Sequence, residues 1–162
     1  MTAETELLLF EASRSQLVRE KIQPALTRGE WVICDRFFDS TTVYQGAARN
    51  LDSKLVKSLN AFAVGDRVPD LTFVLDIDRA TARLRLDHRQ KIRDRLEDES
   101  NEFHERVIHA YRELAQNEPK RLVLLDGRMS FNEIEDDIWR TVSMRFPELA
   151  ANPPSALRHQ QS

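Results

Sequence analysis

The sequence predicts an α/β fold built on a parallel sheet. Three short apolar runs, at residues 31–34, 71–75 and 121–125, are separated by segments in which apolar residues recur at helical spacing. Strands that alternate with helices are joined by right-handed crossovers into a parallel sheet. Because the runs are apolar rather than alternating, both faces of the sheet should be covered by helices. Three such strands make a small sheet, which we interpret as incomplete.

The first quarter of the chain is predicted to be one helix followed by a strand. Apolar residues recur at helical spacing over residues 3–28. Pro24 should kink this helix because it removes one backbone donor, and Gly29 fits the C-terminal stop. Residues 31–34 then read as a short buried strand that ends at Asp35.

The remaining elements are predicted from a capping residue or a turn that precedes a periodic or apolar run. They are a helix from Asp52 or Ser53 through Phe62, the strand 71–75 after Pro69-Asp70, a helix from Asp78 toward Arg89, a helix from Asn101 through Leu114, the strand 121–125 after Pro119, and a helix from the capping box Ser130-x-x-Glu133 to about Phe146. Residues 86–99 are highly charged and are interpreted as a mobile lid-like segment. The tail 147–162, rich in Pro, Ser and Gln, is expected to be disordered.

Composition excludes several classes of protein. The 162 residues suffice for one domain with a core, and the formal net charge of -3 gives no hint of a nucleic-acid surface. No apolar stretch approaches the roughly 20 residues of a membrane span, and the acidic N-terminus has no signal-peptide pattern. The single cysteine, Cys34, cannot form an internal disulfide. We therefore expect a cytoplasmic protein with neither nucleic acid nor membrane as a partner.

Residues 31–46 are the most informative stretch of the chain. The apolar run ends in the pair Asp35-Arg36, and a segment rich in hydroxyl and amide groups, with Tyr44, follows. Ligands of α/β sheets bind just beyond the carboxyl ends of strands, and the planar guanidinium of Arg can make two parallel bonds to phosphate. The stretch indicates a site for a small phosphorylated molecule, where Asp35-Arg36 could bind metal and phosphate. The alternative is an Asp that starts a turn beside a surface Arg.

Four further features are candidates that decide nothing when each is taken alone. Phe10 and Arg14, four residues apart, could contact a base, or be a core Phe beside a solvent-facing Arg. Tyr44 could exclude a 2′-hydroxyl by sterics, or be a half-buried structural residue. Asp126-Gly127-Arg128-Met129 could be a nucleotide-base loop or a plain turn. The arginines of the charged segment could stabilise a moving phosphoryl group or lie on a solvated helix face; they are Arg83, Arg85, Arg89, Arg93 and Arg95.

Taken together, these pieces resemble thymidylate kinase, of the nucleoside-monophosphate kinase group. The resemblance runs from about Glu6 to about Arg145, and it rests on separate motifs in the right order: residues 8–18, 21–26, 35–36, 39–46, 65–76 and 94–97. It implies a parallel three-layer sheet of the P-loop nucleoside-monophosphate kinase type that lacks its first two strands. The domain would cover residues 1–146, with a lid at about 86–99.

The resemblance also implies a role for each candidate residue. Phe10 would stack on thymine and Arg14 would reach its O4 edge; Arg36 would hold the acceptor phosphate of dTMP; Asp35 would organise Mg²⁺ and phosphate; Tyr44 would pack near the deoxyribose, with Gln45 near the base; Arg85 and Arg89 would act in transfer from the lid; and Arg128 and Met129 would border the adenine of ATP. Family members are usually homodimers that pack through helices like the first one here.

The sequence departs from the family pattern at the phosphate donor site. Its four glycines, Gly29, Gly46, Gly65 and Gly127, form no glycine-rich loop that ends in Gly-Lys-Ser/Thr. We therefore expect the C-terminal part of a longer ATP-dependent dTMP kinase, inactive alone, with a gap between the strands 31–34 and 71–75. Two alternatives remain: a non-catalytic nucleotide-binding or dimerisation module, and a related kinase with another monophosphate acceptor.

Overall fold

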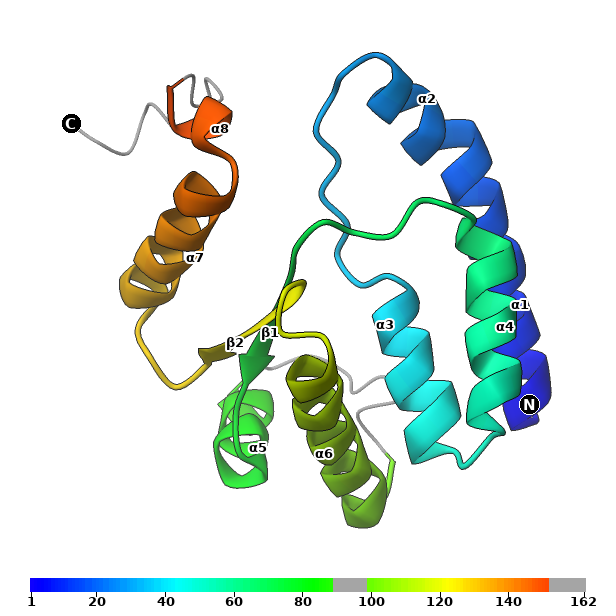
Figure 1. Ribbon diagram of the computed structural model, residues 1–162. Helices are drawn as coiled ribbons and strands as arrows, with labels where there is room; N and C mark the ends of the chain where they lie inside the picture. The colour runs from blue at the N-terminus through cyan, green and yellow to red at the C-terminus, as the bar shows by residue number, and fades with distance from the viewer. Residues whose placement is uncertain (89–98, 152–162) are drawn as a thin grey trace.

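The computed structural model describes residues 1–88 and 99–151, which form helices around a small sheet (Figure 1). The elements in chain order are α1 (Ala3–Leu17), η1 (Val18–Ile22), α2 (Gln23–Thr27), α3 (Phe38–Thr41), η2 (Thr42–Ala48), α4 (Ser53–Val64), β1 (Thr72–Asp76), α5 (Arg79–His88), α6 (Asn101–Asn117), β2 (Leu122–Asp126), α7 (Phe131–Arg145) and α8 (Pro147–Ala151). Most of the predicted lid and the end of the predicted tail lie outside the described residues.

The described sheet has two strands, β1 and β2, which pair in parallel. Thr72 lies opposite Leu122 and Asp76 opposite Asp126, so both strands end level with each other. Parallel strands need a long crossover, and the chain between them carries α5 and α6. This register brings two aspartates together at one edge of the sheet, where α/β proteins bind ligands.

Apart from α5, the helices fall into two groups on either side of the sheet (Figure 1). One group comprises α1 with its continuation η1–α2, α3–η2, α4 and α6, and the other comprises α7 and α8. The main core lies between α6 and η2, where Val43 and Ala48 pack against Phe103 and Val107. The helix α6 also contacts both strands, so this core joins the helical group to the sheet.

The predicted strand at residues 31–34 is not a strand in the structure. The backbone there is extended but unpaired, and three of the four residues are exposed, with Ile33 97% accessible. A strand requires a neighbour that satisfies its backbone donors and acceptors, and β1 pairs with β2 alone among the described residues. The described sheet therefore has one strand fewer than we expected, and the prediction that this run is buried was wrong.

The predicted first helix is present, and Pro24 changes its geometry. The helix widens into the π-turn η1, where the N–H of Gln23 donates to the carbonyl of Val18, directly before Pro24. Because proline has no N–H, the regular bonding pattern is interrupted at this point. Gly29 ends the helix with a positive φ of 78°, as the sequence predicted.

Capping predictions were confirmed, whereas one helix was missed. Asp52 and Asp78 accept backbone N–H bonds at the starts of α4 and α5, and Ser130 and Glu133 form the capping box of α7. Residues 38–48, which the sequence analysis assigned to no element, form the continuous helix α3–η2. The start of the tail was expected to be disordered but forms the short helix α8. Within the described residues, no helix combines the length and apolarity needed to cross a membrane.

Candidate functional site

Asp35 and Arg36 lie in the turn between the extended segment 30–34 and α3. Arg36 has a φ of 64°, in the left-handed region that side chains other than glycine rarely adopt. Its guanidinium lies 5.1 Å from the centre of the Tyr44 ring, a cation–π contact. The turn thus presents an exposed cation above an aromatic ring, and Asp35 is exposed beside it.

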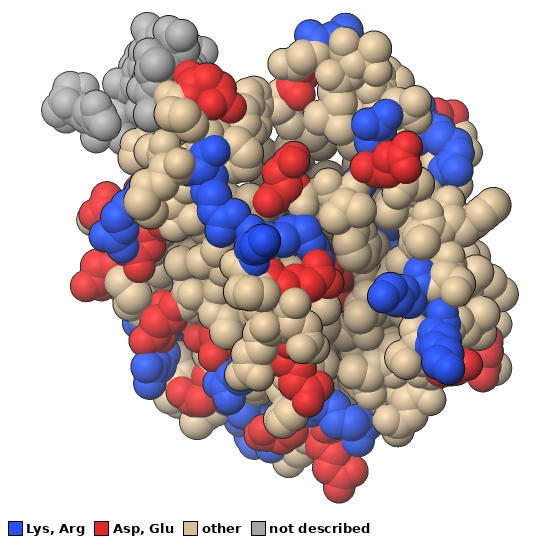
Figure 2. Space-filling view, in the orientation of Figure 1, with Lys and Arg blue, Asp and Glu red and all other residues tan. Residues whose placement is uncertain are grey.

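An open groove of about 1500 Å³ runs from this turn between the extended segment and the sheet. One wall is formed by residues 29–37, and the opposite wall by residues 66–77 around β1. Apolar side chains make up much of both walls, and Trp31 meets Phe146 of the other helical group edge to face, with ring centres 5.0 Å apart. Figure 2 shows a hollow at the top of the molecule, between the two helical groups. Acidic and basic side chains are interspersed on the face in view. The groove separates the predicted strand 31–34 from β1.

Arg14 is buried against α3 rather than exposed to solvent. Its Nη1 donates to Glu11 Oε1 at 2.5 Å and to Asn60 Oδ1 at 3.4 Å. Its Nη2 donates to Thr41 Oγ1 at 2.6 Å and to the carbonyl of Phe37 at 3.5 Å. The last contact places Arg14 next to the Asp35-Arg36 turn. The interpretation of Arg14 as a solvent-facing residue, left open by the sequence, was therefore wrong.

Gln45 is buried too, and its amide is held by charged groups. Gln45 Nε2 donates to Glu6 Oε1 at 2.7 Å, and the same oxygen accepts from Arg49 Nε at 2.9 Å. Arg49 Nη2 donates in turn to Glu99, directly before the cap of α6. Because a carboxylate only accepts hydrogen bonds, the Gln45 amide nitrogen must face Glu6. This network joins α1, η2 and the start of α6.

Tyr44 lies between the turn and α6. It packs against Phe103 and Tyr111, with ring centres 6.0 Å and 6.4 Å away. The Tyr111 hydroxyl is hydrogen-bonded to Ser40 Oγ at 3.0 Å, and burial raises the pKa of Tyr111 to about 12. The Tyr111 phenol is therefore neutral at physiological pH, and it faces the groove close to Arg36.

A buried ion pair anchors α3, which lies between the Asp35-Arg36 turn and the helix η2 that carries Tyr44 and Gln45. Arg121 donates from Nη1 and Nη2 to both carboxylate oxygens of Asp39, at 2.7 Å and 2.8 Å. The guanidinium also lies 5.2 Å from the centre of the Phe38 ring. Hydrogen bonding to Asp39 raises the pKa of Arg121, which stays charged. The pair fixes α3 to the sheet because Arg121 directly precedes β2.

Three predicted site residues, Phe10, Arg85 and Arg89, are not part of this cluster in the described structure. Phe10 lies one turn before Arg14 on α1, is 44% exposed, and does not line the groove that Arg36 lines. Arg85 is exposed on α5. Arg89 lies outside the described residues.

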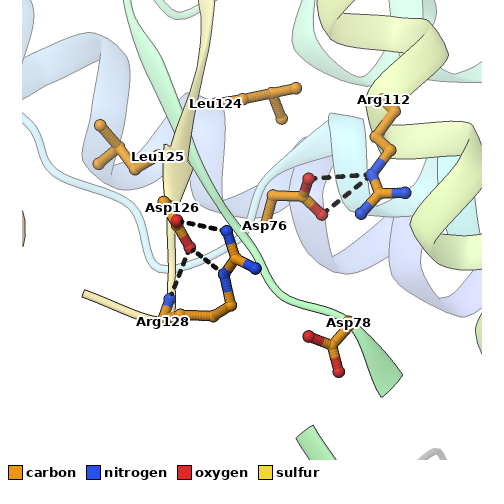
Figure 3. Close-up of a pocket in the computed structure, with 7 residues that line it drawn as sticks. All are labelled: Asp76, Asp78, Arg112, Leu124, Leu125, Asp126 and Arg128. Atoms are coloured by element: carbon orange, nitrogen blue, oxygen red, sulfur yellow. Dashed lines mark hydrogen bonds and ion pairs between the residues drawn. The ribbon is translucent and has the colours of Figure 1, made fainter. Parts of the chain in front are cut away.

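The carboxyl ends of β1 and β2 form a second, smaller pocket of about 270 Å³ (Figure 3). Arg112 of α6 binds Asp76, and Arg128 binds both oxygens of Asp126 at 2.8 Å. Hydrogen bonding to Arg128 lowers the pKa of Asp126 to about 2. Arg128, one of the two residues expected to border adenine, thus lies at this edge, and Met129 follows it in the chain.

The structure brings Arg14, Arg36 and Tyr44 to one region around α3. Of these three only Arg36 lines the groove, and Phe10 does not line it either. Sequence reasoning missed the buried carboxylates Glu6 and Glu11, which hold the polar groups of this region. A signal for Glu11 was present, because Leu7, Glu11, Arg14 and Val18 follow helical spacing and share the buried face of α1 and the start of η1.

Known proteins resemble this chain in both sequence and fold. A family profile described as thymidylate kinase matches residues 1–138 of the chain. The chain belongs to the thymidylate kinase family. Thymidylate kinases of Rhodopseudomonas palustris and Enterococcus faecalis are each 42% identical to it, over 150 and 149 residues, which is 91% of this chain in both cases.

A crystal structure of thymidylate kinase from Ehrlichia chaffeensis superimposes with a TM-score of 0.67 and 29% identity, over 88% of this chain. The match covers 65% of that solved chain, 65% of the R. palustris protein and 70% of the E. faecalis protein. The chain therefore spans about two thirds of the length of the thymidylate kinases that it resembles.

Proposed function

We propose that this chain forms the acceptor side of a kinase that transfers the γ-phosphoryl group of ATP to dTMP, giving dTDP and ADP. The observation that carries this proposal is the exposed Arg36 guanidinium, which lies above the Tyr44 ring and lines the groove. Membership of the thymidylate kinase family supports dTMP as the acceptor. Phosphoryl transfer of this kind requires positioning and charge stabilisation and needs no covalent intermediate.

Each proposed contact to dTMP has a chemical reason. The fork of Arg36 suits two parallel bonds to the phosphate, and the Tyr44 ring beneath it would pack near the deoxyribose. Arg14 would reach the O4 edge of thymine by exchanging its two long bonds, to Asn60 and to the Phe37 carbonyl, for the ligand. Phe10 would stack on the base, and Gln45 would lie close to it.

The donor side is proposed with fewer contacts. Mg²⁺ usually binds through one or two carboxylates together with substrate phosphates, and the exposed Asp35 beside Arg36 fits that pattern. Bound there, the ion would neutralise charge on the phosphates. Arg85 and Arg89 would stabilise the transferred group from the lid, and Arg128 with Met129 would border adenine.

We further propose that the chain alone has no useful kinase activity. Its sequence contains no Gly-Lys-Ser/Thr loop, whose backbone N–H groups and Lys would cradle the donor phosphates. A coupled assay for ADP release with dTMP, ATP and Mg²⁺ should therefore give no turnover above background. Robust turnover would refute this part of the proposal.

A second candidate function is a nucleotide-binding or dimerisation module. It is favoured by three exposed leucines on α1, Leu8, Leu9 and Leu17, which are 56%, 58% and 44% exposed. A homodimer that packs through α1 would cover apolar surface of this kind. Analytical ultracentrifugation tests this candidate, since a chain that stays monomeric at concentrations at which it binds dTMP would contradict a dimerisation module.

Calorimetry with dTMP tests the acceptor site directly. Arg36→Ala should weaken dTMP binding about 10- to 100-fold, because a desolvated charge-assisted pair is lost, and Arg36→Lys should recover only part of it. Arg140→Ala, which removes an exposed arginine on α7, should leave binding unchanged. Equal binding by wild type and Arg36→Ala, or tighter binding of dCMP than of dTMP, would contradict the proposal.

A further inference from the structure

Glu11 is a buried carboxylate that the fold alone does not require. The residue is 6% exposed on α1, and its Oε1 accepts from Arg14 Nη1 at 2.5 Å. Its Oε2 is also buried and has no hydrogen-bond partner among the described residues. A buried carboxylate oxygen without a partner is rare in folded proteins and calls for an explanation.

Burial raises the pKa of Glu11, so the surroundings disfavour its charge, and only the pairing with Arg14 offsets this effect. Replacing a buried ion pair by neutral groups of similar shape is often neutral or favourable for stability. Stability is therefore a poor reason for a charged group at this position. The geometry around Arg14 supplies a better one.

Glu11 is the one charged group among the four hydrogen-bond acceptors of Arg14. The other three, Asn60 Oδ1, Thr41 Oγ1 and the carbonyl of Phe37, are neutral, and two of their bonds are 3.4 Å or longer. Charge-assisted bonds are about twice as strong as neutral ones, so Glu11 does most to fix the guanidinium.

On the described elements that pack against α1, no charged side chain competes with Glu11 for pairing with Arg14. Asp39 of α3 is bound by Arg121, and Arg49, directly after η2, is bound by Glu6 and Glu99. The charged side chains of α4 and η1 are exposed; they are Lys54, Lys57, Arg19, Glu20 and Lys21. Within the described residues, the Glu11–Arg14 pair is thus separate from the other charge pairs.

We propose that Glu11 is a positioning residue, which holds the Arg14 guanidinium in place to read the carbonyl edge of the pyrimidine base. This inference rests on the proposed function, in which Arg14 contacts the base. Glu11 itself does not touch the ligand. Its negative charge fixes Nη1, which leaves the two long bonds of Arg14 as the ones that the base can replace.

The test compares dTMP binding by wild type and Glu11→Gln, using calorimetry over a range of pH. Glutamine keeps the shape and an acceptor but loses the charge, so binding near neutral pH should weaken about tenfold. As the pH falls and Glu11 takes up its proton, the ratio of the two dissociation constants should approach one. The ratio cancels the titration of the dTMP phosphate, which both proteins share.

Two further variants separate positioning from general damage to the site. Glu11→Gln added to Arg14→Ala should weaken binding no further than Arg14→Ala alone, because the role of Glu11 passes through Arg14. Glu20→Gln, which changes an exposed glutamate of η1, should bind dTMP like wild type.

Three results would overturn the inference while leaving the proposed function intact: wild-type affinity in Glu11→Gln, a ratio of affinities that does not change with pH, or full additivity with Arg14→Ala. Failure of the wild-type chain to bind dTMP at all would overturn the proposed function, and this inference with it.

Discussion

Asp39 and Arg121 are separated by 82 residues in the chain, yet they form a two-bond ion pair in the interior. Such a pair is a weak source of stability when it is intact, because both charges have left water. Removing one partner of the pair lowers the stability strongly, because the remaining charge stays buried. The pair therefore acts mainly to specify where α3, and with it Arg36, lies against the sheet.

Asp39→Asn should destabilise the protein by about 3 kcal/mol, measured by urea denaturation at neutral pH. The loss should not be larger, because Arg121 keeps its second and more exposed partner, Glu118. Asp126→Asn is the matched control, since it breaks an equally direct bond to Arg128 at the surface. The control should leave the unfolding midpoint almost unchanged. Equal losses in the two variants would show that burial does not matter here.

Tyr111 gives a pH-dependent prediction, because its pKa of about 12 lies above the value of about 10 for an unfolded tyrosine. The fold favours the neutral phenol, so this contribution to stability is complete below about pH 10 and is lost between about pH 10 and 12. Tyr111→Phe should remove that part of the loss, as measured by unfolding at about pH 9 and pH 11. Tyr44→Phe, the other tyrosine, serves as the control. An unchanged pH dependence in Tyr111→Phe would contradict the assignment.

At the scale of elements, α7 begins with both halves of a capping box. The Ser130 hydroxyl accepts from the Glu133 N–H, and the Glu133 carboxylate accepts from the Ser130 N–H. Ser130→Ala should cost about 1 kcal/mol of stability in urea denaturation, because it leaves one backbone donor of the first turn without its partner. Ser58→Ala, an exposed serine inside α4, should stay within about 0.5 kcal/mol of wild type. A loss in Ser58→Ala as large as in Ser130→Ala would contradict the capping role.

The capping residues could be predicted from sequence because capping is local chemistry: a side chain and the N–H groups two or three residues later suffice. Asp52, Asp78 and Ser130 are all of this kind. The strands β1 and β2 were predicted because each is an apolar run that can be buried on both faces. In the structure the two runs pair with each other.

The extended segment 31–34 and the helix α3–η2 could not be predicted in the same way, because each depends on distant partners. An apolar run becomes a strand only if another strand is beside it, and none is present next to Ile33 in the described sheet. The helix 38–48 contains Ser, Thr and Gly, whose local preferences favour other conformations. It is held instead by contacts from far along the chain, such as Asn60 to Thr42 and Arg121 to Asp39.

At the scale of the whole molecule, the groove exposes apolar surface that a compact domain normally buries. Ile33, Trp31 and Leu75 are each more than half exposed around it. Exposed apolar patches of this kind mark interaction sites or aggregation hazards. The chain should therefore bind the dye ANS in its native state and aggregate at high concentration.

Ile33→Ser should lower native-state ANS fluorescence and slow aggregation, while stability in urea changes by no more than about 0.5 kcal/mol. The side chain contributes little to folding because it is 97% exposed. Val43→Ser, made at a core position that is 1% exposed, should instead lower stability strongly. Unchanged ANS binding in Ile33→Ser would place the exposed apolar surface elsewhere on the molecule.

The candidate site was partly predictable at this scale. The motif after residue 34 identified Arg36 and Tyr44, which the structure brings into contact. The spacing of Phe10 and Arg14 made Arg14 a candidate and the resemblance gave it a role, but neither revealed that this side chain is buried and bound by four acceptors. That arrangement depends on how α1 packs against α3 and α4, which no local pattern encodes.

The left-handed backbone at Arg36 has one more consequence. Glycine would adopt a φ of 64° without steric cost, whereas an arginine there is held by its surroundings. Glycine would therefore relieve the strain of this turn most, but it has no side chain that could hold an anion. At this position glycine would lower the backbone strain but remove the outward-pointing charge, so the least strained turn and the best anion-binding turn require different amino acids.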